Sequence, residues 1–201
     1  MKDRFGNLAI WGIGSILLLW FDQYTKLAAT ISLKGKAPRV LVDGVFELLY
    51  SENRGAAFGI LQGRQGFFFV IALAVLVTAG FMMYRMPSWK NARYHALKIC
   101  LIFITAGAIG NMADRISLGY VVDFLYFSLI DFPIFNVADI YVTTATAFLL
   151  VLFGFYYKDS DLEVFSLKRK AKGETAGGKE NKDNESKKNN KSIESNKEAK
   201  H

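Results

Sequence analysis

The sequence predicts an all-α membrane protein with four transmembrane helices, a small extracytoplasmic β-sheet and an interfacial loop. Of its 201 residues, 52% are hydrophobic and 14% are aromatic. A transmembrane helix needs about 20 mostly apolar residues, and the chain has four long apolar runs, at residues 8–21, 67–84, 97–109 and 140–157. The first and third runs reach the required length only when polar residues at one end are included.

The first run predicts a helix that stays in the protein. Lys2 and Arg4 precede it, as cations precede the apolar core of a secretory signal peptide. The run ends in the polar segment 22–26, however, and not in the small residues of a cleavage site. Since further spans follow, we expect an uncleaved first helix.

The connection at residues 32–66 predicts a small sheet on the outer membrane surface. Two short β-type runs flank Asp43 and Gly44, and an Asp-Gly pair in that setting is typical of a hairpin. Residues 53–59, which follow, are rich in Gly and Ala. Such small residues allow backbones to approach other helices or a ligand closely.

The third run predicts a helix that ends in a polar face. Asn111, Asp114 and Arg115 are three or four residues apart, so they share one side of a helix. The connection that follows, residues 119–135, is apolar and aromatic. Aromatic side chains are stable at the membrane–water interface, so we expect this connection to be an interfacial loop.

The fourth run predicts a capped helix. Asn136 directly precedes it and is a preferred N-cap residue. Asp139 then falls in the first helical turn, where the helix dipole favours a negative charge. Asp131, close to Pro133, predicts an exposed turn.

The chain divides into a membrane domain at residues 1–157 and a charged tail at residues 158–201. The tail has few large apolar groups, so we expect it to be disordered. Short cytoplasmic loops are enriched in Lys and Arg, and the second connection contains Arg85, Lys90 and Arg93, although the first loop also carries cations. We therefore expect a multi-pass protein with both termini in the cytoplasm. The net charge of +7 suits contact with an anionic membrane leaflet better than nucleic acid.

Costly polar side chains gather at one level of the predicted bundle. A charge at the centre of a membrane helix costs roughly 2.5–3.5 kcal/mol or more. With four spans, the polar residues at the ends of the runs all map to the outer face: Asp22, Lys26, Asn53, Arg54, Asn111, Asp114, Arg115, Asp123, Asn136 and Asp139. Structural ion pairs are expected within this set, between Asp22 and Lys26 and between Asp114 and Arg115.

The outer face offers carboxylates, amides and cations for chemistry. His95 maps to the cytoplasmic side, His201 ends the tail, and Cys100, the only cysteine, lies inside the third run. This distribution excludes a Ser–His or Cys–His pair on that face and a zinc site built from His and Cys. Paired acids can divide into an acid and a base and activate water, which makes Asp123 and Asp139 candidates. The alternative is one interfacial loop acid and one helix N-terminal acid.

Two other functions are alternatives to acid–base catalysis. A proton-coupled or ion-coupled transporter would use the acids as a relay, because intramembrane acids mark such pathways. It predicts acids near the midplane and commonly an internal repeat, and the sequence has neither feature. A membrane adaptor that recruits partners through its tail leaves the convergence of the carboxylates unexplained.

Five ordered motifs resemble those of the bacterial lipoprotein signal peptidases, the signal peptidase II family. They are Asp22-Gln23-Tyr24-Thr25-Lys26, Asn53-Arg54-Gly55-Ala56-Ala57-Phe58, Gly110-Asn111-Met112-Ala113-Asp114-Arg115, Val121-Val122-Asp123-Phe124 and Phe135-Asn136-Val137-Ala138-Asp139. The resemblance covers about residues 8–157 and does not extend to the tail.

The resemblance implies an aspartic endopeptidase that removes signal peptides from diacylglyceryl-modified prolipoproteins. It implies a place in the bacterial cytoplasmic (inner) membrane, an active site facing outward, inhibition by the cyclic peptide globomycin, and no metal or other cofactor. It assigns catalysis to Asp123 and Asp139. The supporting and substrate-binding residues are Asp22, Lys26, Asn53, Asn111, Asp114, Arg115 and Asn136. Expected partners are prolipoproteins and membrane lipids, without nucleic acid, and the protein is expected to be a monomer.

Overall fold

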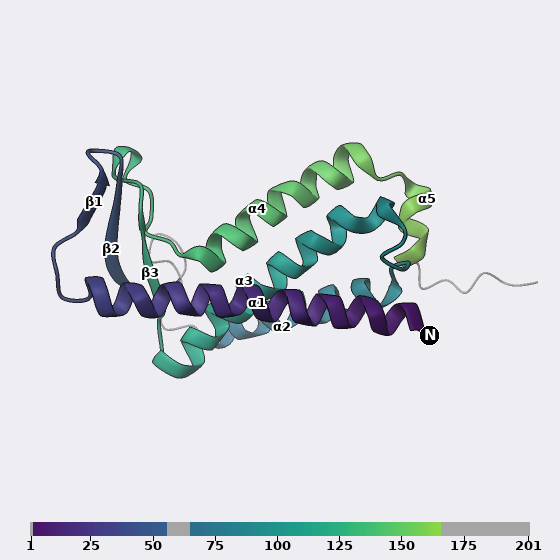
Figure 1. Cartoon of the computed structure of the whole chain (residues 1–201), viewed down its shortest axis with the longest axis horizontal. Helices are drawn as coiled ribbons and strands as arrows, with labels where there is room; N and C mark the ends of the chain where they lie inside the picture. The colour runs from purple at the N-terminus through teal and green to yellow at the C-terminus, as the bar shows by residue number, and fades with distance from the viewer. Residues whose placement is uncertain (1, 56–64, 166–201) are drawn as a thin grey trace, which may run out of the picture. The chain divides into compact units, whose positions relative to one another are not determined.

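The computed structural model describes residues 2–55 and 65–165. Four long helices form the bundle in Figure 1: α1 (Lys2–Leu33), α2 (Gln65–Arg85), α3 (His95–Leu118) and α4 (Val137–Val151), the last continued by a π-helical turn, η4 (Leu152–Tyr156). All four are long and apolar enough to cross a membrane. The predicted four-span architecture is therefore confirmed.

α3 is the most buried of the four helices. Its Leu97 and Leu101 form an apolar core together with residues of the neighbouring helices, such as Met83 of α2. The outward faces are apolar as well: Leu17 and Trp20 of α1 are 62% and 65% exposed. A water-soluble bundle carries polar side chains on such faces, so these surfaces suit lipid contact.

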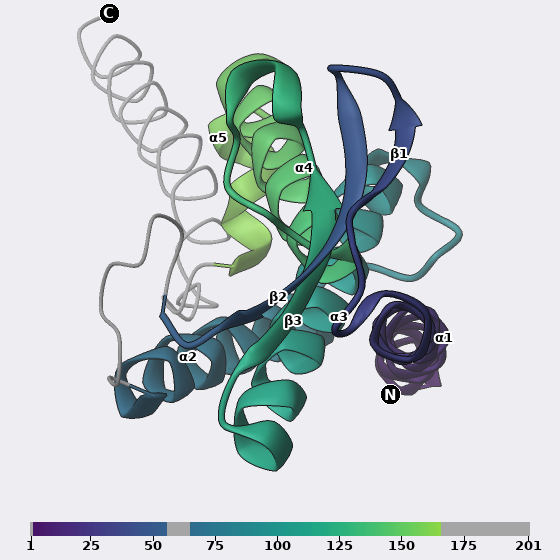
Figure 2. The ribbon, with the colours of Figure 1, turned by 90° about the vertical axis from the view of Figure 1, so that its left-hand side faces the viewer.

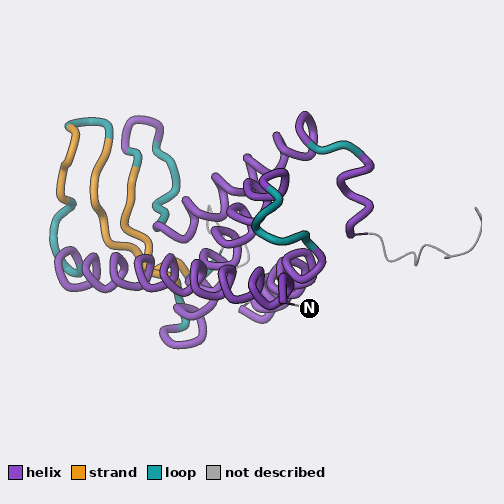
Figure 3. The backbone as a smooth tube through the Cα atoms, turned by 45° about the vertical axis from the view of Figure 1, so that its right-hand side comes forward, coloured by secondary structure: helices purple, strands orange, loops and turns teal. Residues whose placement is uncertain are grey.

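A three-stranded antiparallel sheet lies across one end of the bundle, as Figures 2 and 3 show. Its strands, in spatial order, are β1 (Arg39–Val42), β2 (Phe46–Asn53) and β3 (Val121–Tyr126). The predicted hairpin is confirmed, because β1 and β2 pair across the turn that contains Gly44. Gly44 has φ 62°, a conformation that residues with a Cβ adopt rarely.

The structure corrects part of the predicted interfacial loop. Residues 121–126 form β3, in which Asp123 lies opposite Ser51 of β2. The pairing gives the backbone N–H and C=O groups of this apolar segment hydrogen-bond partners, which they need wherever water is scarce. Of the rest of the connection, the short 3₁₀ turn η3 (Ser128–Ile130) has no buried residue.

The N-terminus of α1 and the short helix α5 (Asp159–Leu162) both lie at the end of the bundle opposite the sheet, as Figure 1 shows. The sequence assigns residues 158–165 to a disordered tail, but α5 is helical and is followed by a 3₁₀ turn, η5 (Glu163–Phe165). An ion pair of 2.7 Å between Asp161 and Arg93 holds this segment. The rest of the predicted tail lies outside the described residues, so its disorder stays a prediction.

A buried polar cluster links α1 and α3 to the backbone that follows α2, at the end of the bundle far from the sheet and near the 3₁₀ turn η2 (Ala92–Tyr94). Lys98, which interrupts the third apolar run, donates to the Pro87 carbonyl at 2.7 Å. Asn7 donates to the carbonyls of Met86 and Pro87 at 2.9 and 3.0 Å. Carbonyls at a helix C-terminus lack intrahelical partners, so Lys98 and Asn7 have a structural role.

Gly107 lets α3 approach α4 closely. A Cβ at this position would lie 2.5 Å from the Ala138 carbonyl oxygen and 2.7 Å from Cγ2 of Val142. Gly107→Ala is therefore expected to lower the free energy of unfolding by about 1–3 kcal/mol, as overpacking does. Thermal denaturation in detergent micelles measures the loss.

The matched control for this prediction is Gly12→Ala in α1, where a Cβ would meet no atom within 4 Å. Alanine favours the helix more than glycine by about 0.8–1.0 kcal/mol, so the control is expected to keep or raise the melting temperature. Equal melting temperatures for the two variants would contradict the close approach.

Candidate functional site

Asp123 and Asp139 lie at the sheet end of the bundle, one on β3 and one in the first turn of α4. Asn136 contacts both carboxylates. Its Nδ2 donates to Asp123 Oδ1 at 2.6 Å and its backbone N–H donates to Asp139 Oδ2 at 3.2 Å. Asn136 Oδ1 also accepts the Asp139 backbone N–H, so the predicted N-cap is confirmed as part of a capping box. One residue thus links the two acids.

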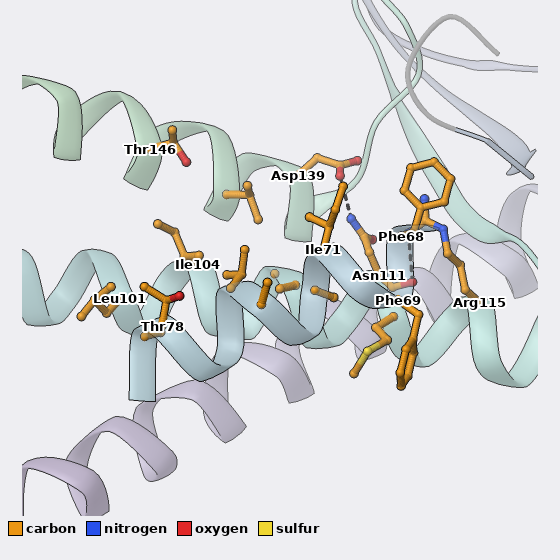
Figure 4. A pocket seen from close by; sticks show the side chains of 18 of the residues that line it. Phe68, Phe69, Ile71, Thr78, Leu101, Ile104, Asn111, Arg115, Asp139 and Thr146 are labelled. Atoms are coloured by element: carbon orange, nitrogen blue, oxygen red, sulfur yellow. Dashed lines mark hydrogen bonds between the residues drawn. The ribbon is translucent and has the colours of Figure 1, made fainter. Parts of the chain in front are cut away.

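Each of the two carboxylates also accepts a hydrogen bond from a second asparagine side chain. Asn53, at the end of β2, donates to Asp123 Oδ2 at 2.9 Å. Asn111 of α3 donates to Asp139 Oδ1 at 2.7 Å, and Figure 4 shows this contact. Asn111 Oδ1 in turn accepts a hydrogen bond of 3.1 Å from Asn136. Three amides from three different segments therefore hold the two acids, and each donates without adding a charge.

Behind the amides, Lys26 joins two buried acids. Its Nζ lies 2.9 Å from Asp22 Oδ2 and 3.0 Å from Asp114 Oδ2, and all three side chains are at most 4% exposed. The same Nζ donates to Asn111 Oδ1 at 3.0 Å. The predicted Asp22–Lys26 ion pair is confirmed. This cluster connects α1 to the residues around Asp139.

The predicted ion pair between Asp114 and Arg115 is wrong. Asp114 pairs with Lys26, while Arg115 donates to the carbonyls of Asn111 and Gly55, at 3.2 and 3.1 Å. The physical reason is helix geometry, because consecutive residues point in different directions and only those three or four apart are neighbours. Arg115 therefore contacts the backbone at Asn111 and Gly55 and does not pair with the buried carboxylate of Asp114.

The structure removes one residue from the predicted polar cluster and adds another. Arg54 is exposed and pairs with Glu52 at 3.5 Å, so it does not join the site. Gln23 joins it without having been a candidate. Its Nε2 donates to Asp22 Oδ2 at 3.2 Å and to Asp114 Oδ1 at 2.9 Å. The sequence did contain a signal for Gln23, because it is an uncharged polar residue between Asp22 and Lys26, whose charges are costly at the end of a membrane helix.

The environment of Asp123 favours its protonated form. Burial raises the pKa of Asp123 to about 7, and the nearby charge of Asp139 acts in the same direction, while the hydrogen bonds from Asn53 and Asn136 oppose the rise. A carboxylic acid that keeps its proton near neutral pH can donate a hydrogen bond to a carbonyl group. Such an acid beside an ionised carboxylate can supply the two halves of acid–base chemistry.

An apolar cavity of about 860 Å³ opens beside Asp139, between α2, α3 and α4. Figure 4 shows Asp139, Asn111 and Arg115 grouped at one end of it, with Leu101, Ile104 and Thr146 further along. The volume falls within the usual range of ligand sites, about 300–1,000 Å³. The cavity therefore suits a long apolar ligand with a polar group at the acid end.

Within residues 2–55 and 65–165, no three His, Cys, Asp or Glu side chains come together in an arrangement that suits a metal ion. Every carboxylate oxygen of Asp22, Asp114, Asp123 and Asp139 has an amide N–H or the Lys26 ammonium as a partner. The prediction that the protein needs no metal stays untested.

Comparison with known proteins identifies the family. The model of the family described as Signal peptidase (SPase) II matches residues 15–155. The lipoprotein signal peptidase of Streptococcus thermophilus (strain CNRZ 1066) is 42% identical over 142 residues, which are 70% of this chain and 89% of the relative. That of Clostridioides difficile (strain 630) is 39% identical over 145 residues, covering 72% and 95%.

Solved structures agree with this result. One, described as "Bacterial membrane enzyme structure by the in meso method at 2.3 A resolution", is 27% identical with a TM-score of 0.63 and covers 83% of this chain and 95% of its own. A second, described in the same words at 1.9 Å, is 28% identical with a TM-score of 0.62 and covers 74% and 95%. This multi-pass membrane protein therefore belongs to the signal peptidase II family.

Proposed function

We propose that this chain is an aspartic endopeptidase that cleaves signal peptides from lipid-modified prolipoproteins, with Asp123 and Asp139 activating water. One observation carries the proposal. Buried Asp123 and half-buried Asp139 are joined through Asn136, and Asp139 lies at the polar end of a large apolar cavity. Family membership supports the peptidase activity and disfavours the transporter and the adaptor.

The proposed reaction divides the work between the two acids. Two carboxylates whose charges repel each other hold one proton between them, and the raised pKa of Asp123, to which the charge of Asp139 contributes, supports Asp123 as the protonated member. Ionised Asp139 takes a proton from a water molecule, whose oxygen bonds to the scissile carbonyl carbon. Asp123 donates a hydrogen bond to the carbonyl oxygen, the C–N bond then breaks, and the leaving amine receives the proton that Asp139 took from water. No covalent intermediate with the enzyme is formed.

Asp123 and Arg115 are the donors proposed for the negative charge that develops on the carbonyl oxygen. Asn53 and Asn136 keep Asp123 in place. The Arg115 guanidinium lines the cavity and lies 4.4 Å from the Phe68 ring centre. Fixed donors of this kind are most effective where water is excluded. In the proposed complex, the acyl chains of the substrate fill the apolar part of the cavity at about 0.8 kcal/mol per buried CH₂.

We propose that the site faces the outside of the cytoplasmic membrane. The N-terminus of α1 and α5 lie at the end of the bundle far from the sheet. The α2–α3 connection, with Lys90 and Arg93, precedes α3 at that same end. Basic connections favour the cytoplasm, so the opposite end, with Asp123, is assigned to the outer face.

The direct test is cleavage of a purified precursor by the full chain in detergent or liposomes. We expect a shift on a gel for a diacylglyceryl-modified prolipoprotein, no shift for the same precursor without lipid, and inhibition by globomycin. Reagents that modify serine or cysteine nucleophiles are expected to have no effect. Cleavage that does not depend on the lipid, or that such reagents abolish, would contradict the proposal.

The acid pair also predicts how activity depends on pH. Because the pKa of Asp123 is about 7, kcat/KM is expected to fall as the pH rises through about 7, where the shared proton is lost. A rate profile between about pH 5 and 9 measures this. A profile that stays flat across pH 7 would contradict the assignment of the proton to Asp123.

Stability is expected to follow the same titration. The folded state holds the Asp123 proton more tightly than the unfolded state does, because the pKa is raised from 3.8 to about 7. The free energy of unfolding therefore falls as the pH rises between these two values and stays low above them. Asp123→Asn is expected to remove this loss, so the variant should melt higher than the unsubstituted protein above about pH 7.

A further inference from the structure

Two buried acids behind the site hold the backbone next to the proposed catalytic residues. Asp22 Oδ1 accepts the backbone N–H of Ala138 at 2.9 Å, and Ala138 directly precedes Asp139. Asp114 Oδ2 accepts the backbone N–H of Val122 at 3.2 Å, and Val122 directly precedes Asp123. The two contacts are equivalent, one for each acid of the pair. The distance between Asp22 and Asp114 therefore sets the distance between the two backbone segments.

Two side chains from one helix connect these acids. Lys26 contacts both at 2.9 and 3.0 Å, and Gln23 Nε2 contacts both at 3.2 and 2.9 Å. The Gln23 amide also lies 3.3 Å from the Gly110 carbonyl of α3. Each carboxylate thus receives one ammonium, one side-chain amide and one backbone N–H.

The charge of this buried cluster explains why an amide, that of Gln23, suits the second contact between Asp22 and Asp114. Two carboxylates and one ammonium, all at most 4% exposed, leave one excess negative charge in a buried place. Such a charge is tolerated when its oxygens are fully hydrogen-bonded. Gln23 supplies a donor to both acids. A cation at its position would add the desolvation cost of a further buried charge.

We propose that Gln23 is a positioning residue of the peptidase. By holding Asp22 and Asp114 together, it fixes the backbone at Ala138 and Val122 and so keeps Asp139 and Asp123 within reach of one water molecule. Gln23 does not line the cavity, so it acts on the reaction through the two acids and not through the substrate. The inference rests on the proposed function of Asp123 and Asp139.

Gln23→Met tests the inference, because methionine has a similar length and no donor. We expect kcat to fall by about 10- to 100-fold, the effect of misplacing reacting groups by up to about 1 Å, while KM stays within about twofold because the cavity is untouched. The fall of kcat/KM near pH 7 is expected to move, since it reflects the separation of Asp123 and Asp139. A purely structural residue would not move it.

Gln23→Glu provides a second measurement that does not depend on the methionine variant. Near pH 8 a third carboxylate faces Asp22 and Asp114 beside the single Lys26 cation, so activity is expected to be low. Protonation of the new carboxyl restores one donor, and the deficit relative to the unsubstituted protein is expected to shrink as the pH falls toward about 5.5.

Two control variants separate positioning from general stability. Lys98→Met removes a buried polar contact at the far end of the bundle; we expect it to lower the melting temperature and to leave kcat and the pH profile unchanged. Tyr24→Phe alters the exposed neighbour of Gln23 and is expected to change neither the melting temperature nor kcat nor the pH profile.

The outcomes distinguish the inference from the proposed function. Unchanged kcat and pH profile in Gln23→Met, or a change confined to KM, would overturn the positioning role. A pH-independent deficit in Gln23→Glu would do the same if the methionine variant does not fold. Failure of the unsubstituted protein to cleave the lipid-modified precursor would instead reject the proposed function itself.

Discussion

Asp123→Asn and Asp139→Asn are each expected to lower kcat by at least about 10²–10⁴-fold while the protein still inserts and folds. Asparagine keeps the shape of the side chain but can neither take a proton from water nor keep the shared proton. Because the pair acts as a unit, the double variant is expected to be little worse than either single one. Single-turnover cleavage of a lipid-modified precursor measures the effect.

Asp131→Asn is the matched control for these substitutions. Asp131 is exposed, lies in the connection between β3 and α4 and accepts a hydrogen bond from Tyr126 at 2.7 Å. Its loss is expected to leave cleavage unchanged. Full activity in either variant of the acid pair would reject the two-acid mechanism, even if the other variant were inactive.

Lys26→Met is expected to have the second-largest effect, on stability as well as on activity. It leaves Asp22 and Asp114 buried without their shared cation. Breaking a buried ion pair from one side costs about 3–5 kcal/mol. The variant is also expected to be inactive, because the backbone contacts next to Asp123 and Asp139 depend on these acids. Denaturation in detergent micelles gives the change in stability.

Two further variants make this prediction specific to the buried charge. Lys34→Met removes the cation of an exposed pair with Glu52, and such pairs contribute little to stability, so the melting temperature is expected to stay the same. Combining Lys26→Met with Asp114→Asn removes one uncompensated charge and is expected to recover part of the lost stability. A single Lys26→Met variant as stable as Lys34→Met would contradict the interpretation.

Much of the fold follows from local patterns in the sequence. The four apolar runs determine four helices because hydrophobicity and length alone decide whether a segment suits a membrane. Asn136 predicted a helix start, and the Asp-Gly pair before Val45 predicted a hairpin, since both depend on interactions within a few residues. The expected convergence of the polar run ends agrees with the contacts of Lys26, Asn111 and Asn136.

Other features depend on residues far apart in the chain. The third strand at residues 121–126 exists because β2, about 70 residues earlier, offers its edge. The partner of Asp114 is Lys26 on α1 and not the adjacent Arg115. Neighbouring positions on a helix point apart, and the packing of α1 against α3 selects the partner that sequence proximity suggested wrongly.

The sequence by itself therefore determined the class of the protein, its spans and the residues worth testing, because these follow from composition, periodicity and short motifs. Only the tertiary structure decided that Asn136 links Asp123 to Asp139, that Gln23 connects the acids behind them, and that a cavity of about 860 Å³ opens beside Asp139. The reason is physical. Hydrogen bonds and cavities depend on distances of a few ångströms between separate helices, and these distances are set by packing.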